Sequence, residues 1–163
     1  MKKALAAALV SLAALAAAPA QADGLPDYRA VSLVGPQYVV QGQTFTRTLT
    51  IDNAGTSGGD WAVAGYIRNV PHAAYLGVSD VQGFTGGCSL SKFLSGAFNY
   101  VVCRGAFLHP GESASFTLTF RAPGSGWLGW VYYGNGEARK TSMELDSNRA
   151  NDSVGSNTTT VIA

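Results

Sequence analysis

The sequence predicts an all-β fold built from about seven to nine short strands. Glycine is frequent, with 20 Gly in 163 residues, and only 13% of the residues are charged. Polar and apolar residues alternate most clearly in residues 44–51 and 113–120. Because successive side chains of a strand point to opposite faces, each segment has one buried face and one solvent-facing face. Short strands separated by Gly, Pro and Asn turns are the pattern of a sandwich or a barrel.

The two alternating segments also predict part of the core. In residues 44–51 every even position is Thr, and the aliphatic and aromatic residues share the opposite face. In residues 113–120 small polar residues alternate with apolar ones. The core residues expected from these two strands are Phe45, Leu49, Ile51, Ala114, Phe116, Leu118 and Phe120.

The remaining strands are predicted between turn signals. Residues 28–34 and 38–40 form a first strand interrupted at Gly35-Pro36, a break that suits an edge strand changing its pairing partner. Further strands are expected at residues 61–68, 74–81, 98–104, 127–133, 138–145 and 158–162. Turns are expected at residues 52–59, 83–87, 109–112 and 123–126.

The first 22 residues have the three parts of a secretory signal peptide. Lys2 and Lys3 give a positive start, residues 4–18 are an apolar run with one Ser, and Ala20-Gln21-Ala22 provides the small residues that a signal peptidase recognises. The run is shorter than the roughly 20 residues that a membrane anchor needs. We therefore expect cleavage before Asp23, which leaves a single domain at residues 23–163 in the periplasm or outside the cell.

The charge balance of residues 23–163 excludes several kinds of partner. Nine Lys and Arg stand against ten Asp and Glu, a net charge of −1. Such a balance provides neither a basic surface for nucleic acid nor a polybasic patch for anionic lipid. No second apolar stretch approaches membrane-spanning length, so we expect the exported part not to be embedded in a membrane.

Both cysteines, Cys88 and Cys103, lie in the part predicted to be exported. Oxidising compartments favour pairing, and an even count leaves no thiol over. The pair would close a loop of about 15 residues, for which the chain-entropy model gives a stabilisation of about 3 kcal/mol. We expect a disulfide, with a redox or metal-binding role as the alternative.

Several motifs follow one another in an order that resembles a known family. A Gly-Gln turn at 42–43 leads through the Thr-rich strand to an Asn-Ala-Gly corner at 53–55. The motifs that follow are Pro71, Gly87-Cys88, Val102-Cys103, residues 108–113 and residues 146–152. Together, over residues 27–162, they resemble the bacterial Ig-like repeats of surface proteins: the cell-adhesion-related domain found in bacteria and a related conserved repeat of unknown function. The resemblance implies an immunoglobulin-like antiparallel β-sandwich and a role in adhesion.

The sequence carries no catalytic motif that we recognise. His72 and His109 each adjoin a proline in a predicted turn, and neither is accompanied by a nucleophile elbow or a Ser-x-x-Lys motif. We therefore predict a protein that is not an enzyme and needs no cofactor.

Two segments are candidates for ligand binding. One segment contains Asp146, Asn148 and Asp152, whose oxygen atoms suit calcium. They lack the EF-hand arrangement, and the favoured interpretation is a turn in which Asx side chains bond their own backbone. The aromatic segment 127–133 offers flat rings for sugar stacking if it lies on the surface. The favoured interpretation is that its side chains fill the core, with Gly129 marking a bulge or a close approach. The residues that would bind a ligand are Trp127, Trp130, Tyr132 and Tyr133.

The leading hypothesis is an exported, non-enzymatic Ig-like domain that contacts a protein or polysaccharide of the cell surface or extracellular space. One alternative is a carbohydrate-binding module that uses the aromatic strand. A second is a small outer-membrane barrel, in which the Thr-rich faces would line a polar lumen.

Overall fold

The computed structural model describes residues 24–58, 63–68, 72–92, 99–126, 128–132, 136–140, 148–155 and 158–163. The predicted signal peptide lies outside these residues. The elements are β1 (Tyr28–Val34), β2 (Tyr38–Val40), β3 (Thr44–Asn53), β4 (Val63–Arg68), β5 (Ala74–Gln82), β6 (Cys88–Lys92), β7 (Asn99–Ala106), β8 (Ser113–Arg121), β9 (Gly129–Tyr132), β10 (Gly136–Lys140), the 3-10 helix η1 (Arg149–Asn151), β11 (Ser153–Val154) and β12 (Thr159–Ile162). Across the described part of the chain, no helix has the length and apolar character needed to cross a bilayer.

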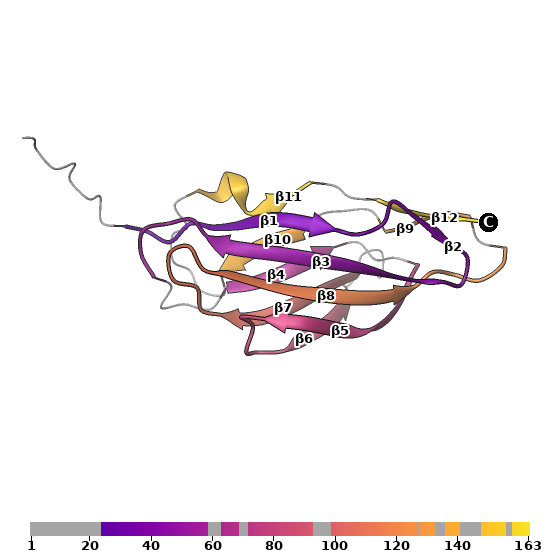
Figure 1. Ribbon diagram of the computed structural model, residues 1–163, viewed down its shortest axis with the longest axis horizontal. Coiled ribbons are helices and arrows are strands. Elements are labelled where there is room, and N and C mark those ends of the chain that lie inside the picture. The colour runs from indigo at the N-terminus through magenta and orange to yellow at the C-terminus, as the bar shows by residue number, and fades with distance from the viewer. Residues whose placement is uncertain are drawn as a thin grey trace, which may run out of the picture.

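The strands form two large sheets that face each other and a small sheet at one end (Figure 1). The front sheet has the order β1-β3-β8-β5, and the back sheet has the order β11-β10-β4-β7-β6. The end sheet, with the order β2-β12-β9, extends past the sandwich on the side where the chain ends. Every strand pair is antiparallel except β2 with β12, which run parallel.

This strand order defines an immunoglobulin-like topology. In the Ig fold, strands A, B, E and D form one sheet and strands C, F and G form the other. Here β1, β3, β8 and β5 take the A-B-E-D positions, and β4, β10 and β11 take the C-F-G positions. The hairpin β6–β7 is inserted between positions D and E and widens the back sheet beyond β4. The chain is therefore an Ig-like antiparallel β-sandwich.

The first strand divides between two sheets, as its sequence predicted. β1 pairs with β3 in the front sheet, whereas β2 pairs with β12 in the end sheet. The division falls at Gly35-Pro36, where Pro36 has no N–H to continue a ladder. A side chain at position 35 would lie 2.5 Å from Cδ of Arg47, so glycine is needed for this close approach.

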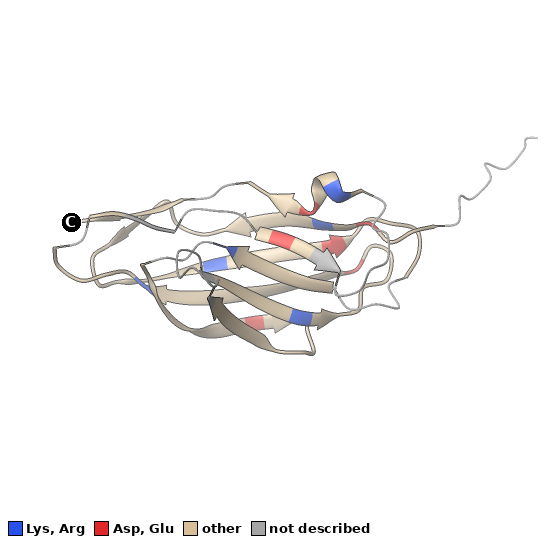
Figure 2. Cartoon of the chain, turned by 180° about the vertical axis from the view of Figure 1, so that it is seen from behind, with Lys and Arg blue, Asp and Glu red and all other residues tan. Residues whose placement is uncertain are grey.

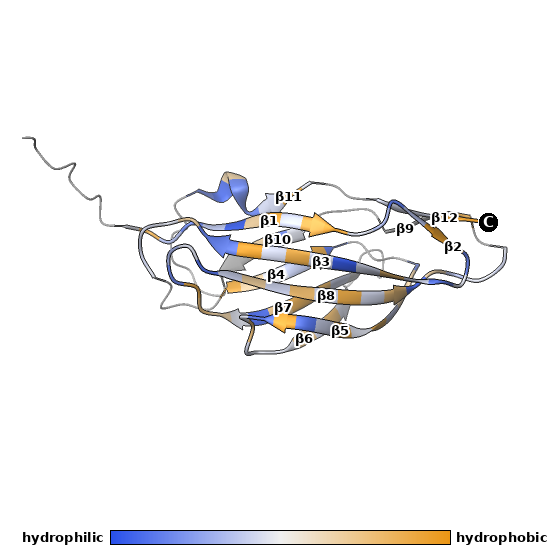
Figure 3. Cartoon of the chain, in the orientation of Figure 1, coloured by the Kyte–Doolittle hydropathy of each residue, from blue (hydrophilic) through white to orange (hydrophobic). Residues whose placement is uncertain are grey.

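All seven core residues predicted from the two alternating strands are buried. β3 and β8 pair in continuous register, which places Phe45 opposite Phe120 and Leu49 opposite Phe116. The rings of Phe45 and Phe120 stack with centroids 5.5 Å apart. Figure 3 shows the alternation as bands of colour along both strands. Apolar side chains of the back sheet complete the core: Val63, Ile67, Val101, Ala106 and Ala138.

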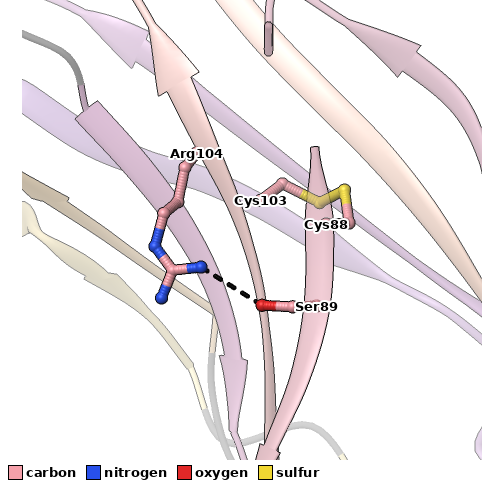
Figure 4. Close-up of a disulfide and its surroundings, with 4 residues drawn as sticks. All are labelled: Cys88, Ser89, Cys103 and Arg104. Atoms are coloured by element: carbon pink, nitrogen blue, oxygen red, sulfur yellow. Dashed lines mark hydrogen bonds between the residues drawn. A yellow bond between two sulfur atoms is a disulfide. The ribbon is translucent and has the colours of Figure 1, made fainter. Parts of the chain in front are cut away.

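Cys88 and Cys103 form the predicted disulfide (Figure 4). They occupy directly opposite positions of β6 and β7, with Cα atoms 4.0 Å apart. Ser89 and Arg104 each follow one of the two cysteines in the chain, and Nη1 of Arg104 donates a hydrogen bond diagonally across the hairpin to Oγ of Ser89 at 3.1 Å. The disulfide therefore closes the inserted hairpin rather than linking the two sheets.

Strand ends and two short strands differ from the sequence prediction. Among the described residues, Leu128 lies outside β9 although a strand was expected there, and β10 begins two residues earlier than expected, at Gly136. β6 and β11 were not predicted, because β6 has a single aliphatic residue, Leu90, and β11 has only two residues. Such short strands exist because neighbouring strands supply their hydrogen-bond partners, a long-range effect that alternation does not report. Positions 61, 62, 98, 127, 133 and 141–145 of the predicted strands lie outside the described residues.

Candidate interaction surface

The end sheet exposes apolar side chains on its outer face. Its register pairs Tyr38 with Thr160, Val39 with Val161, and Val40 with Ile162. The inner residues of this sheet, Val39 and Val161, are buried. By contrast, Tyr38 is 62% exposed, Ile162 43% and Val40 40%. We call the surface formed by Tyr38, Val40, Thr160 and Ile162 the end face.

The end face is uncharged and apolar. None of the residues of β2, β9 and β12 is Asp, Glu, Lys or Arg. The strands of this end are drawn without charged residues in Figure 2, and β2 and β12 are mostly orange in Figure 3. Leu128, directly before β9, is a further exposed apolar residue at 64%. Contiguous exposed apolar surface on a folded domain is typical of a binding site.

The predicted aromatic strand contributes its backbone to this sheet. Trp130 lies opposite Thr160 in the register, and Tyr132 lies opposite Thr159. A register shift between Thr159 and Thr160 makes β9 irregular, so the simple alternation that would place residues 130 and 132 on one face does not apply to it. The side chains of both residues, and all of Trp127 and Tyr133, lie outside what the structure describes.

The backbone conformation of Gly129 is consistent with the irregular pairing of β9. Its φ of +138° is in a region that L side chains rarely adopt, and it pairs with Val161 at the start of the strand. The register shift of β9 follows Gly129, between the partners of Thr159 and Thr160.

A buried arginine lies beneath the end sheet. Arg47 occupies an inward position of β3, between Phe45 and Leu49, and is fully buried. Its Nη2 donates hydrogen bonds to the carbonyl oxygen of Pro36, at 2.9 Å, and to Oγ1 of Thr159. Oγ1 of Thr159 in turn donates to the carbonyl oxygen of Pro36 at 2.7 Å. These bonds offset part of the cost of burying a guanidinium group and tie the end sheet to the sandwich.

The sequence pattern did not lead us to predict a structural role for Arg47, although its position in the strand indicates one. It stands on the apolar face of a strand whose other residues alternate strictly. A charged residue in that position predicts a buried polar contact, but the sequence does not identify the contacting groups.

Where it is described, the candidate calcium loop makes one hydrogen bond within the loop and one to the segment before β1. Oδ1 of Asn148 accepts a hydrogen bond from the backbone N–H of Ala150 at 3.3 Å and caps η1. Nδ2 of Asn151 donates to Oδ1 of Asp27 at 3.0 Å. Asp146 lies outside the described residues. Among the residues that the structure describes, no three His, Cys, Asp or Glu side chains converge as a metal site would require.

The two histidines lie in separate surface segments. The backbone N–H of His109 donates to Oε2 of Glu112 at 2.8 Å, and the N–H of Glu112 donates to the carbonyl oxygen of His109 at 2.9 Å. His109 therefore belongs to the predicted turn before β8. His72 lies at an exposed bend before β5.

The fold and the end face together define an Ig-like domain with an exposed apolar surface at one end. No protein-family model matches the sequence. No curated protein matches it either. Membership of the bacterial surface-repeat family therefore remains a resemblance.

Several solved structures are similar to this chain in shape. One is a CARDB domain from Pyrococcus furiosus in complex with di-metal ions, with a TM-score of 0.48, 17% identity, and coverage of 84% of this chain and 89% of that one. Another is a type I cohesin from Pseudobacteroides cellulosolvens, with a TM-score of 0.42, 14% identity, and coverage of 80% and 91%. A third protein catalyses macrocyclization in alchivemycin A biosynthesis, with a TM-score of 0.43, 10% identity, and coverage of 85% and 88%. None of these likenesses bears on a ligand or an activity of this chain.

Proposed function

We propose that this chain is an exported, non-enzymatic Ig-like domain that mediates adhesion by binding a protein of the cell surface or extracellular space through its end face. The observation that carries the proposal is the adjacency of Tyr38, Val40 and Ile162 on one uncharged sheet surface. Export is supported by the N-terminal signal pattern and by the disulfide, because disulfides persist in oxidising compartments.

The composition of the end face suits a protein partner. Tyrosine is enriched among the residues that dominate binding energy at protein interfaces. Complete burial of an aliphatic side chain such as Ile162 contributes roughly 1.5–3 kcal/mol. The hydrogen bonds of Arg47 hold the end sheet in place, and a surface that is already ordered loses less entropy on binding.

A polysaccharide is the second candidate partner. The ring of Tyr38 and the hydroxyl of Thr160 lie in one row of the sheet, and Trp130 occupies the next backbone position of that row. An aromatic ring beside a hydroxyl suits a sugar, which offers both an apolar C–H face and hydrogen-bonding groups.

Retention assays test the proposal. Labelled protein is mixed with cell-envelope fractions and with a panel of insoluble polysaccharides. We expect saturable retention on the envelope fraction, lost after protease treatment of that fraction. The variants Tyr38→Thr and Ile162→Thr keep strand-forming residues and should each weaken retention at least about tenfold.

A matched control tests whether the loss of any exposed aliphatic side chain would weaken retention. Val34 is 63% exposed but lies on the front sheet, so Val34→Thr should leave retention unchanged. Retention on a polysaccharide instead would favour the second candidate. Binding through the end face would be refuted if all three variants were retained equally. It would also be refuted if the parent protein were retained on none of the materials.

A further inference from the structure

The side chains of β6 attach it only weakly to the rest of the fold. β6 lies at one end of the back sheet and, within the described part of the chain, pairs only with β7. Of its two apolar residues, Leu90 is 40% exposed, and Cys88 packs against the core from a partly buried position. A strand that buries so little apolar surface gains little from the hydrophobic effect. Its attachment therefore rests on hydrogen bonds to β7 and on the disulfide.

β7, by contrast, is firmly held. It lies between β4 and β6 in the back sheet, so both of its edges are paired. Val101, Val102 and Cys103 are fully buried. The disulfide therefore joins a strand that buries little of its surface to a strand that is largely buried.

The segment directly before β6 has its own attachment to β7. Phe84 is buried, and the N–H of Gly86 donates a hydrogen bond to the carbonyl oxygen of Arg104 at 2.8 Å. The N–H of Arg104 donates to the carbonyl oxygen of Gly87 at 3.1 Å. Gly87 has a φ of +73°, which glycine adopts without a steric penalty. The firmly attached segment thus ends at Gly87, and Cys88 follows it directly.

We infer that the disulfide is a redox-sensitive latch for β6. While Cys88 and Cys103 are joined, β6 covers the edge of β7. Once the bond is reduced, β6 separates from β7 beyond Gly87, and the rest of the sandwich stays folded. β7 then becomes the edge strand of the back sheet, and its N–H and C=O groups that faced β6 are exposed to solvent. The redox state of one bond therefore sets whether this edge is closed or open.

The opening step is a thiol–disulfide exchange with a dithiol as the reductant. Cys88 is partly exposed and Cys103 is fully buried, so a thiolate of the dithiol attacks Sγ of Cys88. The bond between the two cysteines breaks, and Cys103 leaves as a thiolate that takes up a proton. The second thiol of the reductant then displaces Sγ of Cys88, which is also protonated, and the reductant leaves as a disulfide. Two electrons and two protons pass from the dithiol to the protein.

The position of the disulfide in the chain confines the opening to the hairpin. The two cysteines are 15 positions apart, and the segment between them lies within the inserted hairpin. A disulfide restricts mainly the segment that it encloses. β3 and β8, which pair in continuous register, lie outside that segment. Regions with few buried apolar contacts open more readily than the core of a fold, so we expect β6 to open first.

Hydrogen exchange with and without dithiothreitol tests the inference. In native buffer the dithiol should reduce the bond, and the backbone N–H groups of β6 should then exchange at least about tenfold faster. The N–H of Gly86 and the N–H groups shared by β3 and β8 should keep their protection. Intact mass reports the reduction, and circular dichroism reports whether the sandwich remains folded.

Two variants serve as controls. The double variant Cys88→Ser, Cys103→Ala should show fast exchange in β6 without reductant and should not respond to dithiothreitol; if it does not fold, the reduced parent protein carries the test. Ser89→Ala removes the hydrogen bond from Arg104 but keeps the disulfide, so β6 should stay protected in this variant.

Several results would overturn the inference. One is a disulfide that resists the dithiol in native buffer, and another is a β6 that keeps its protection after reduction. Faster exchange over β3 and β8 as well would show that the disulfide supports the whole sandwich. Loss of protection in Ser89→Ala would show that the hydrogen bond, rather than the disulfide, holds the strand. None of these results depends on the end face, which contains no residue of β6 or β7.

Discussion

Asn53 joins three segments that lie apart in the sequence. It is fully buried at the end of β3. Its Oδ1 accepts hydrogen bonds from the backbone N–H of Asp27, at 3.1 Å, and of Gly55, at 3.0 Å. Its Nδ2 donates to the carbonyl oxygens of Ser57, at 3.0 Å, and Leu108, at 2.9 Å. All four hydrogen-bonding positions of the amide are therefore used at one corner of the sandwich.

The change Asn53→Ala should strongly destabilise the fold. It leaves two backbone N–H groups and two carbonyl oxygens without their partner, and each buried unsatisfied group costs about 1–3 kcal/mol. We expect a loss of at least about 3 kcal/mol in the free energy of unfolding, measured by urea denaturation. Asn148→Ala, which removes one cap at an exposed 3-10 turn, should cost less than about 1 kcal/mol. Equal effects of the two changes would show that the corner contributes little.

At the scale of elements, the main feature is the link between the end sheet and the sandwich. β2 and β12 come from opposite ends of the chain, and the bond from Thr159 to Pro36 joins residues 123 positions apart. Arg47 adds the contact from β3. The end sheet has only three short strands in the described part of the chain. Its attachment to the sandwich therefore depends on this buried group of hydrogen bonds.

Replacing Arg47 by Met should loosen the end sheet selectively. Met keeps most of the buried volume but removes both hydrogen bonds. Global stability should change by only about 1 kcal/mol, because an apolar replacement also removes the cost of burying a charge. Hydrogen exchange should become faster for the N–H groups of Thr160 and Gln41, which bond across β2 and β12.

The exchange experiment has a built-in reference. The N–H groups shared by β3 and β8 should keep their protection in the Arg47 variant. Arg121→Met changes an exposed arginine on β8 and should alter neither region. Uniformly faster exchange over both sheets would mean that Arg47 supports the whole sandwich rather than its end.

At the scale of the whole molecule, stability depends on the apolar layer between the two large sheets. Phe116 of β8 is fully buried at its centre, and its ring meets that of Phe84 edge-on with centroids 5.5 Å apart. A side chain added to Gly65 of β4 would lie 2.7 Å from the Phe116 ring. The two sheets therefore touch closely at this point.

We expect Phe116→Ala to lower the free energy of unfolding by about 3–5 kcal/mol, through lost burial and the cavity that remains. Thr119→Ala, on the outer face of the same strand, should change it by less than about 1 kcal/mol. Thermal and chemical denaturation measure both. A larger effect at Thr119 would mean that the outer face of β8 is covered by another part of the protein.

Much of the fold follows from local patterns in the sequence. Alternation assigned the inner faces of β3 and β8 correctly, because strand geometry fixes a two-residue period whatever the neighbours are. Gly35-Pro36 predicted the division of the first strand, since proline cannot donate to a ladder. The pairing of Cys88 with Cys103 followed from an even cysteine count in a chain predicted to be exported.

The candidate surface and the edge held by the disulfide were decided by tertiary structure. Tyr38 and Ile162 became neighbours only through the parallel pairing of β2 with β12, and β6 lies at a sheet edge because it pairs with β7. The aromatic strand was recognised in the sequence, but its irregular register was not. The sequence by itself determined the location of the longer strands and which faces of β3 and β8 are buried, because these depend on backbone geometry and hydrophobicity along a few residues. The tertiary structure alone decided which faces and edges remain exposed, because exposure depends on contacts between segments that lie far apart in the sequence.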